Sequence, residues 1–275
     1  MKPAAFQYHA PRSLPDALAV LQSHPEASPL AGGQSLMPLL NARLATAPHL
    51  LDLGRVEGLD RIEEADDTIR IGAMVRQGDL LRSALLRRAL PLITEAAAHI
   101  GHAAIRNRGT IGGSLCQLDP WAELPLVAML LDAAMHLASP AGTRSLPFRD
   151  FAIAAGRNAR QPGELLTHVT FPAAPATRRH GFAEIAERPN DPADAAAAVT
   201  IDLDAKGTVT RAAVAVAGPF PVARRLPAAE ALLTGQRPTP ALRQQASETA
   251  LPPGTDHDHA TLVRVALRRA LEQAA

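Results

Sequence analysis

Two short segments with paired glycines constrain this chain more than any other feature. One reads AGGQS at residues 31–35 and the other reads TIGGS at residues 110–114. Glycine adopts backbone angles that are closed to other residues, and without a side chain it lets a ligand come close to the main chain. Successive backbone N–H groups in such a turn form an anion-binding concavity, which a following helix strengthens. Two glycine turns, each with a small hydroxyl residue beside it, therefore predict two clamps on one diphosphate.

The common nucleotide-binding motifs are absent from the sequence. There is no G-x-G-x-x-G of a dinucleotide-binding fold and no G-x-x-x-x-G-K-[ST] of a P-loop NTPase. HIGH at residues 99–102 matches a signature of class I aminoacyl-tRNA synthetases, but a chain whose only lysines are Lys2 and Lys206 lacks the lysine-rich partner loop. His99 and His102 are better explained as residues at the end of a helix. The diphosphate is therefore expected in a different architecture.

Composition excludes several further classes of protein. A length of 275 residues is enough for two domains, and a net charge of +1 gives no electrostatic footprint for nucleic acid. Cys116 is the only cysteine, which rules out an internal disulfide and an iron–sulfur cluster held by this chain alone. The N-terminus lacks the apolar core of a signal peptide, and the most apolar stretch carries Asp132 and is too short to span a bilayer. We therefore expect a cytoplasmic protein without a membrane span.

The first half of the chain is predicted to alternate helices and strands. SLPDALAVLQSH begins a helix at Ser13, a strand then runs through the first glycine pair into a helix capped by Ser35, and HLLDL forms a second strand. An Asp-Asp turn predicts a hairpin, and helices follow at about 77–88 and 91–101. After the second glycine turn, Asp119-Pro120 introduces the helix WAELPLVAMLLDA. A second hairpin and the strand ELLTHVTFP complete this half.

The second half follows FPAAPATRRHG, a stretch rich in proline and arginine that predicts a domain boundary. FAEIAE, AAVTIDLD and TVTRAAVAVAG are three predicted strands, and LPAAEALLTG is a helix that Gly235 stops. The tail from Thr239 is predicted to be helical, with an interruption at LPPGTD. This order of elements indicates an α+β fold and not a doubly wound sheet.

Three stretches of the sequence resemble the FAD-binding medium subunit of molybdenum hydroxylases, and they follow one another in the order found in that family. The group includes the medium subunits of carbon monoxide dehydrogenase and bacterial xanthine dehydrogenase. The three stretches read LAGGQSLMPLLNARLA, IGAMVRQGDL and IRNRGTIGGSLCQLDPWAELPLVAMLLDA, and the resemblance is dense over residues 1–172. It implies a PCMH-type FAD-binding domain at 1–175, made of two α+β subdomains at about 1–56 and 57–175. It also implies a C-terminal α+β domain at 176–275 with a small antiparallel sheet and helices.

The resemblance also implies a cofactor site, because in that family the two glycine turns hold the FAD pyrophosphate between two subdomains. Backbone amides of both glycine pairs would bond phosphate oxygens, with the hydroxyls of Ser35 and Thr110 assisting. Glu123 matches an acidic position that contacts the cofactor in relatives, and a carboxylate favoured by the dipole in a first helical turn explains it equally well. Leu166 matches an apolar position near the flavin ring. The residues expected to bind FAD are Pro29, Leu30, Ala31, Gly32, Gly33, Gln34, Ser35, Leu36, Thr110, Ile111, Gly112, Gly113, Ser114, Glu123 and Leu166.

The family's cofactors and partners follow from the same resemblance. It places a molybdenum cofactor on a large subunit and [2Fe-2S] clusters on a small subunit of a heterotrimer, either alone or as a dimer of such trimers. Electrons reach FAD on this oxidoreductase subunit and leave to NAD, a quinone, oxygen or another acceptor. None of the histidines lies in a motif for covalent flavin attachment, so we expect non-covalent FAD. No residue of this chain needs to act as a general acid or base, and the chain alone is expected to be inactive as a hydroxylase.

Some positions depart from the family pattern or have two explanations. Relatives carry a lysine where FAEIAERPND has Glu184, and a bulky residue where it has Pro192, so the surroundings of the flavin ring are expected to differ. Cys116 either approaches the cofactor or is a small buried residue. DHDH at 256–259 either binds a metal or caps a helix. Two arginines, Arg106 and Arg108, either face phosphate or lie on the surface.

Two rival functions remain open from the sequence. A self-sufficient flavin-dependent oxidase or dehydrogenase of the same fold would need a substrate pocket with a catalytic base over the flavin. A scaffold that had lost FAD would be expected to have damaged glycine turns, and both are intact.

Overall fold

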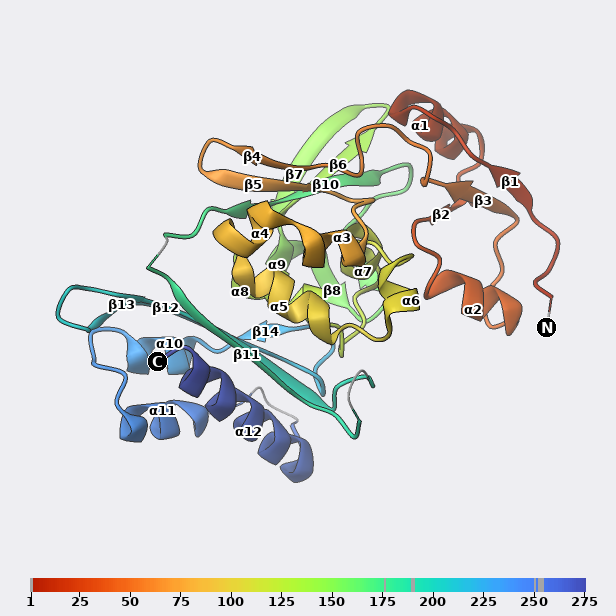
Figure 1. The fold of residues 1–275 in the computed structure, drawn as a ribbon. Coiled ribbons are helices and arrows are strands. Elements are labelled where there is room, and N and C mark those ends of the chain that lie inside the picture. Colours follow the sequence, from red (N-terminus) through yellow and green to blue (C-terminus); the bar gives the residue numbers. More distant parts are fainter. Residues whose placement is uncertain (1, 176, 189–190, 250, 252–254) are drawn as a thin grey trace.

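The structure, a computed structural model, describes residues 2–175, 177–188, 191–249, 251 and 255–275. Residue 176, next to the expected domain boundary, and part of LPPGTD lie outside the described residues. Figure 1 shows a small N-terminal unit beside a larger body in which helices are layered between two sheets. The outer parts of that body are a sheet from the middle of the chain and a sheet with helices from the C-terminal part.

The N-terminal unit is a three-stranded parallel sheet of order β1-β3-β2 with two helices. The first helix begins directly after Ser13, which caps it by accepting a hydrogen bond from the Asp16 N–H, and the helix buries Ala17 and Leu21. The elements are β1 (Gln7–His9), α1 (Leu14–Ser23), β2 (Ser28–Leu30), α2 (Leu36–Asn41) and β3 (His49–Asp52). The first glycine pair lies between β2 and α2.

The predicted cap of α2 is wrong. Ser35 has helical backbone angles, and its side chain makes no capping hydrogen bond. The first turn of the helix is joined to the glycine segment through the main chain instead, because the Met37 N–H donates to the Gly33 carbonyl.

The central unit is a five-stranded antiparallel sheet of order β4-β5-β10-β6-β7. Both predicted hairpins are present, and Asp66 takes a φ of 50° in the turn of the first. The strands are β4 (Ile62–Ala65), β5 (Thr68–Gly72), β6 (Ala134–Ser139), β7 (Gly142–Pro147) and β10 (Leu165–Pro172), with a small pair β8 (Ala152–Ala154) and β9 (Arg157–Asn158). The helices of this unit are α3 (Gln77–Arg82), α4 (Ala84–Ala89), α5 (Pro91–His99), α6 (Ala103–Arg106), α7 (Ile111–Gln117), α8 (Glu123–Leu130) and α9 (Phe148–Phe151).

The single helix predicted over 77–88 is two helices. The chain breaks at Ser83, which takes extended angles between α3 and α4 and accepts a hydrogen bond from the Leu86 N–H. Serine competes with a helix in this way because its hydroxyl can satisfy a nearby backbone donor. The prediction over 91–101 is nearly right, since α5 ends at His99 and Gly101 follows with a positive φ.

The C-terminal unit is an antiparallel sheet of order β11-β12-β13-β14 with three helices. Its elements are β11 (Arg179–Ile185), β12 (Ala195–Leu203), β13 (Val209–Ala217), β14 (Arg224–Arg225), α10 (Pro227–Leu233), α11 (Pro240–Ser247) and α12 (His257–Gln273). Alternate side chains of β12 face opposite sides, so that Ala196 and Ala198 join the core with α5 and α8 while Ala197 and Val199 join a second core with α12. The sheet is therefore buried on both faces, and the central helices lie between two sheets.

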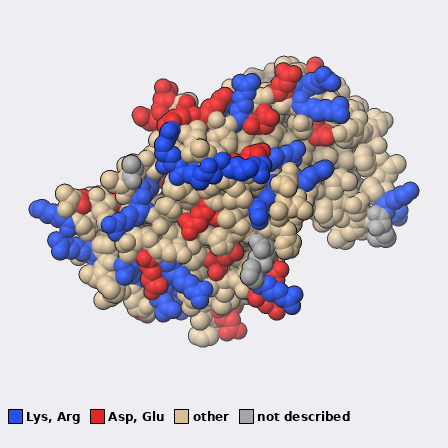
Figure 2. All heavy atoms as spheres, viewed as in Figure 1, with Lys and Arg blue, Asp and Glu red and all other residues tan. Residues whose placement is uncertain are grey.

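The DHDH segment caps a helix. Asp256 is the N-cap of α12 and accepts hydrogen bonds from the N–H groups of Asp258 and His259. Within the described residues, no helix is both long enough and apolar enough to cross a membrane. On the face drawn in Figure 2, basic and acidic side chains are interspersed.

Candidate functional site

The two glycine segments lie against each other. A Cβ added to Gly32 would overlap the carbonyl oxygen of Arg108 and the Cα of Gly109, so no other residue fits there without moving the backbone. A Cβ on Gly113 would come within 3.5 Å of the Ala31 Cβ. Glycines far apart in the sequence therefore permit one close contact between the N-terminal unit and the start of α7.

The first segment offers a run of unused backbone donors. Within the described residues, the N–H groups of residues 31–36 donate to no acceptor. Gly33 takes a φ of 72°, which turns the chain between β2 and α2, and the Gln34 side chain holds the turn by donating to the Gly32 carbonyl. Successive free N–H groups in such a turn form a concavity suited to an anion.

The second segment has a different structure from the turn expected. Its glycines lie in the first turn of α7, whose N-cap is Thr110. The Ile111 N–H donates to Val75, the Gly112 N–H donates to the Ala73 carbonyl at 2.9 Å, and the Gly113 N–H donates to Thr110 Oγ1 at 3.0 Å. The structure thus gives the N–H groups of both Gly112 and Gly113 partners other than the phosphate oxygens expected from the sequence.

The need for glycine at position 112 comes from packing. A Cβ there would lie 2.6 Å from both the Cβ and the carbonyl oxygen of Ala73. Gly112 lets α7 lie directly on the connection between β5 and α3, and this contact sets the position of Thr110 and Ser114 at the site.

One cleft of about 600 Å³ runs along both glycine segments. Of the residues expected to bind the cofactor, only Ile111 is not on its wall; that side chain is 1% exposed and lies in the central core. The expected residues that line the cleft are Pro29, Leu30, Ala31, Gly32, Gly33, Gln34, Ser35, Leu36, Thr110, Gly112, Gly113, Ser114, Glu123 and Leu166.

Several cleft residues were missed by the sequence reasoning. Trp121, Asn158 and Arg160 all line the cleft. Asn158 donates to the Cys116 carbonyl, and Arg160 donates to the Glu164 carbonyl. The β8–β9 pair that carries Asn158 is too short to give a period-2 pattern, so no local signal marked this wall of the cleft.

The two arginines weighed as phosphate ligands lie elsewhere. Neither Arg106 nor Arg108 lines the cleft. The Arg106 side chain donates to the carbonyls of Ile100 and Gly101 and so holds the turn after α5. Arg108 contributes its carbonyl, which accepts a hydrogen bond from Arg76.

Two titratable side chains on the cleft wall have shifted pKa values. Burial raises the pKa of Glu123, the first residue of α8, to about 7, and the negative charge of Glu184 acts in the same direction. Burial raises the pKa of the Cys116 thiol to about 11, so the thiol stays protonated at neutral pH. Glu123 both heads a helix and faces the cleft, which agrees with each of the two explanations given for it.

Glu184 lies behind the cleft wall and not on it. Its Oε1 is 2.9 Å from His99 Nδ1, and this contact joins β11 to the last residue of α5. Its other oxygen, Oε2, is buried and has no hydrogen-bond partner within the described residues. The hydrogen bond to Glu184 raises the pKa of His99. Pro192 does line the cleft, together with Asp191.

Comparison with known proteins gives consistent matches over the whole chain. The family described as "FAD binding domain in molybdopterin dehydrogenase" matches residues 4–174, and the family described as "CO dehydrogenase flavoprotein C-terminal domain" matches residues 180–274. The chain is 41% identical over 234 residues to the 6-hydroxypseudooxynicotine dehydrogenase complex subunit alpha of Paenarthrobacter nicotinovorans, which covers 85% of this chain and 79% of the relative.

Solved structures match as closely. A chain of quinoline 2-oxidoreductase from Pseudomonas putida 86 superposes with a TM-score of 0.94 at 32% identity, covering 100% of this chain and 98% of the other. A chain of carbon monoxide dehydrogenase from Hydrogenophaga pseudoflava superposes with a TM-score of 0.93 at 33% identity, again covering 100% and 98%.

Proposed function

The chain belongs to the family of FAD-binding medium subunits of molybdenum hydroxylases, and from this premise we propose that its cleft holds FAD with the pyrophosphate between residues 32–35 and 110–114. The observation that carries the proposal is the run of free N–H groups at residues 31–36, which lines the same cleft as the start of α7. A diphosphate fits this part of the cleft because the first segment presents N–H groups without a partner and Thr110 and Ser114 of the second segment line the same cleft.

The two segments hold the pyrophosphate in different ways. Residues 31–36 supply backbone N–H groups directly. At the second segment the N–H groups of Gly112 and Gly113 are already bonded within the protein, so this segment contributes the hydroxyls of Thr110 and Ser114. Leu166, an apolar residue on the wall, excludes water from the ring end of the cleft.

The redox chemistry belongs to the cofactor. When bound, FAD accepts electrons and passes them to an acceptor, and the protein sets its position and electrostatic surroundings. Glu123 is the titratable group suited to that second task, because with a pKa of about 7 its carboxyl holds a proton in the cleft near neutral pH. No residue of the chain is assigned to bond making or breaking on a substrate.

The chain functions as one oxidoreductase subunit of a heteromer. Its single cysteine cannot hold an iron–sulfur cluster, so the proposal places [2Fe-2S] clusters on a small subunit and the molybdenum cofactor on a large one. The proposal includes a cytoplasmic location and the division into domains at 1–175 and 176–275, with subdomains at about 1–56 and 57–175.

The first test is the flavin content of the purified chain, measured from its visible absorption and identified as FAD after release by heat. We expect one non-covalent FAD per chain. A colourless chain that takes up no FAD would overturn the site.

The second test is co-expression with candidate large and small subunits. A specific interface buries at least about 1,000 Å², so a stable heteromer is expected in gel filtration, with hydroxylation only in the complex. A monomeric chain that oxidises a substrate by itself would favour the self-sufficient flavin oxidase instead.

A further inference from the structure

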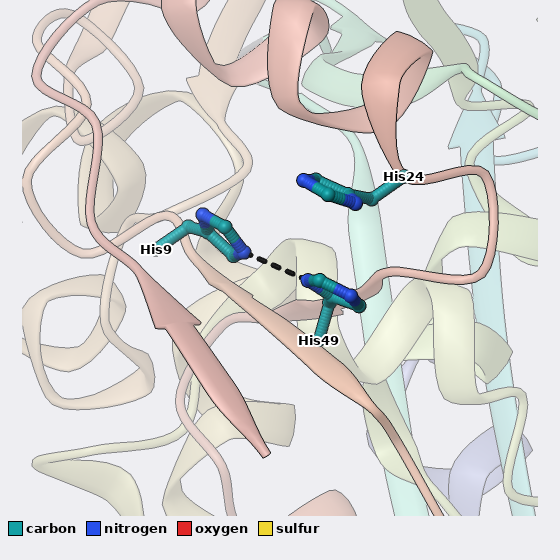
Figure 3. Close-up of side chains that lie close together, drawn as sticks. All are labelled: His9, His24 and His49. Carbon is teal, nitrogen blue, oxygen red and sulfur yellow. Dashed lines mark hydrogen bonds between the residues drawn. The ribbon is translucent and has the colours of Figure 1, made fainter.

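Three histidines lie together in the N-terminal unit, away from the cleft (Figure 3). His9 ends β1, His49 begins β3, and His24 directly follows α1 as its C-cap residue. All three are partly buried, and none lines the cleft between the glycine segments. The function proposed above does not use them.

The imidazoles are close enough to share one ion. His9 Nε2 is 3.0 Å from His49 Nδ1, and one ligand nitrogen from each ring lies within 4.8 Å of the other two. Zinc–nitrogen bonds of about 2.0–2.1 Å in a tetrahedral site place the nitrogens roughly 3.3 Å apart. The pair from β1 and β3 is therefore already near the spacing that coordination needs.

Glu26 is positioned to orient one of these rings. Its Oε1 is 3.2 Å from His49 Nε2, on the opposite side of the ring from His9. A carboxylate at that distance keeps the proton on Nε2 and leaves the Nδ1 lone pair facing His9. Metal-binding histidines commonly have such a carboxylate on their other nitrogen.

His24 is the ligand that has to move. Its ring is stacked on the ring of His49, with the centroids 4.0 Å apart and the planes 18° from parallel. The nitrogen lone pairs of two stacked rings point in parallel planes and not toward one shared point. The residue lies outside the helix and 35% of its side chain is exposed, so the ring has room to turn. A shift of up to about 1.5 Å brings its nitrogen to the tetrahedral spacing.

A second histidine pair shows what a stack without a metal site looks like. His136 and His168 stack with centroids 4.1 Å apart, but each has a threonine hydroxyl as partner, at 2.9 Å in both cases. No third imidazole joins them among the described residues. The N-terminal cluster differs in having three rings and a carboxylate that orients one of them.

We propose that His9, His24 and His49 bind one divalent transition-metal ion of the zinc class, with Glu26 orienting His49. Three imidazole nitrogens suit Zn²⁺, and a water molecule completes the tetrahedron on the exposed side. The bound ion joins β1 and β3 to the end of α1, so it acts as a structural clip on the unit that carries the first glycine segment.

The test is calorimetric titration of Zn²⁺ into the chelator-treated full-length chain, with any histidine tag removed. We expect one Zn²⁺ per chain, and a loss of affinity greater than about tenfold for His9→Gln, His24→Gln and His49→Gln. Glu26→Gln should weaken binding by about 10–100-fold, the usual effect of removing such a partner. His168→Gln is the matched control, and it should bind Zn²⁺ as the unchanged chain does.

Co²⁺ provides a readout that needs no variant. Tetrahedral coordination by three nitrogens and a water should give visible absorption from Co²⁺ at one equivalent, and Zn²⁺ should abolish it. The proposal is overturned if no ion binds, if the three histidine variants bind Zn²⁺ unchanged, or if His168→Gln weakens binding as much as they do. FAD content should stay unchanged in all of these variants, which separates the metal site from the flavin site.

Discussion

At the scale of single residues, the glycines of the two segments are required for different reasons. Gly32 has no room for a side chain because the Arg108 carbonyl lies against it, and Gly112 has none because of Ala73. Gly33 is required mainly by its φ of 72°. The sequence indicated that glycine matters at these positions, but close approach to another segment and a positive φ both select glycine, so the sequence could not separate the two.

The conformation of Gly33 makes a direct prediction for FAD binding. Gly33→Ala places a Cβ at positive φ, which costs about 1–2 kcal/mol, and crowds the side chains of Leu30 and Met37 at 3.2–3.3 Å. We expect this variant to lose FAD while the chain remains folded by circular dichroism. Gly58→Ala is the control, because Gly58 has a φ of 79° with nothing within 4 Å. Equal flavin content in the two variants would contradict the clamp at residues 32–35.

The raised pKa of Glu123 predicts how stability depends on pH. The folded chain keeps the Glu123 proton up to about pH 7, whereas the unfolded chain releases it above about 4.5, so this group lowers the free energy of unfolding as pH rises between those values. Glu123→Gln removes the buried charge and should raise the melting temperature more at pH 8 than at pH 5. Exposed Glu187→Gln serves as control. A difference that does not vary with pH would show that Glu123 is not destabilised by burial.

At the scale of helices and strands, residue type predicted caps and turns correctly where no other group competed for the same backbone hydrogen bonds. Ser13 caps α1, and Asp66 turns the first hairpin, as their residue types predict. The predictions that failed had different causes. Ser83 ends a helix because its own hydroxyl accepts a hydrogen bond from the Leu86 N–H, a local alternative to continuing the helix. The second glycine pair enters a helix because the Ala73 and Val75 carbonyls receive its first N–H groups, and these partners are distant in sequence, so no local pattern reports them.

The start of α7 supplies the prediction at this scale. Thr110 is 1% exposed and caps the helix, so Thr110→Ala should lower the free energy of unfolding by about 1 kcal/mol and weaken FAD binding. Thr110→Ser keeps the hydroxyl and should restore most of both.

Thr239 is the matched control for this experiment. It caps α11 in the same way but lies in the C-terminal unit, away from the cleft. Thr239→Ala should therefore lower stability by a similar amount and leave the FAD dissociation constant unchanged. If both alanine variants affect FAD equally, the effect of Thr110→Ala comes from stability alone.

At the scale of the whole molecule, the sequence indicated the order of the helices and strands but not which helices pack on which face of each sheet. The strands of the C-terminal sheet were predictable, yet the burial of β12 on both faces depends on α5 and α8 on one side and α12 on the other. The residues of the candidate site likewise fall into those that the sequence indicated and those that it did not. Residues in the glycine motifs were found from the sequence, whereas Trp121 and Arg160 reach the cleft only through the packing of separate elements.

The contact between α5 and β11 predicts a pH-dependent link between the central and C-terminal units. The hydrogen bond that His99 donates to Glu184 is the largest cause of the raised pKa of His99, and partial burial opposes it. A histidine whose folded pKa is raised contributes stability that is fully present below its unfolded pKa of about 6.5 and is lost as pH rises through the folded value. His99→Gln should therefore cost more stability at pH 6 than at pH 9.

A double-mutant cycle separates this pair from the packing around it, because the His99 ring also lies 5.0 Å from the ring of Phe182. The coupling energy between His99→Gln and Glu184→Gln, measured by denaturant unfolding, should be present at pH 6 and decline by pH 9. Hydrogen exchange should show the same loss of protection in β11 for both single variants, because each removes a charged member of the hydrogen bond that ties Glu184 to α5. A coupling energy that is equal at the two pH values would mean that His99 holds the two units together by ring packing and not by its charge.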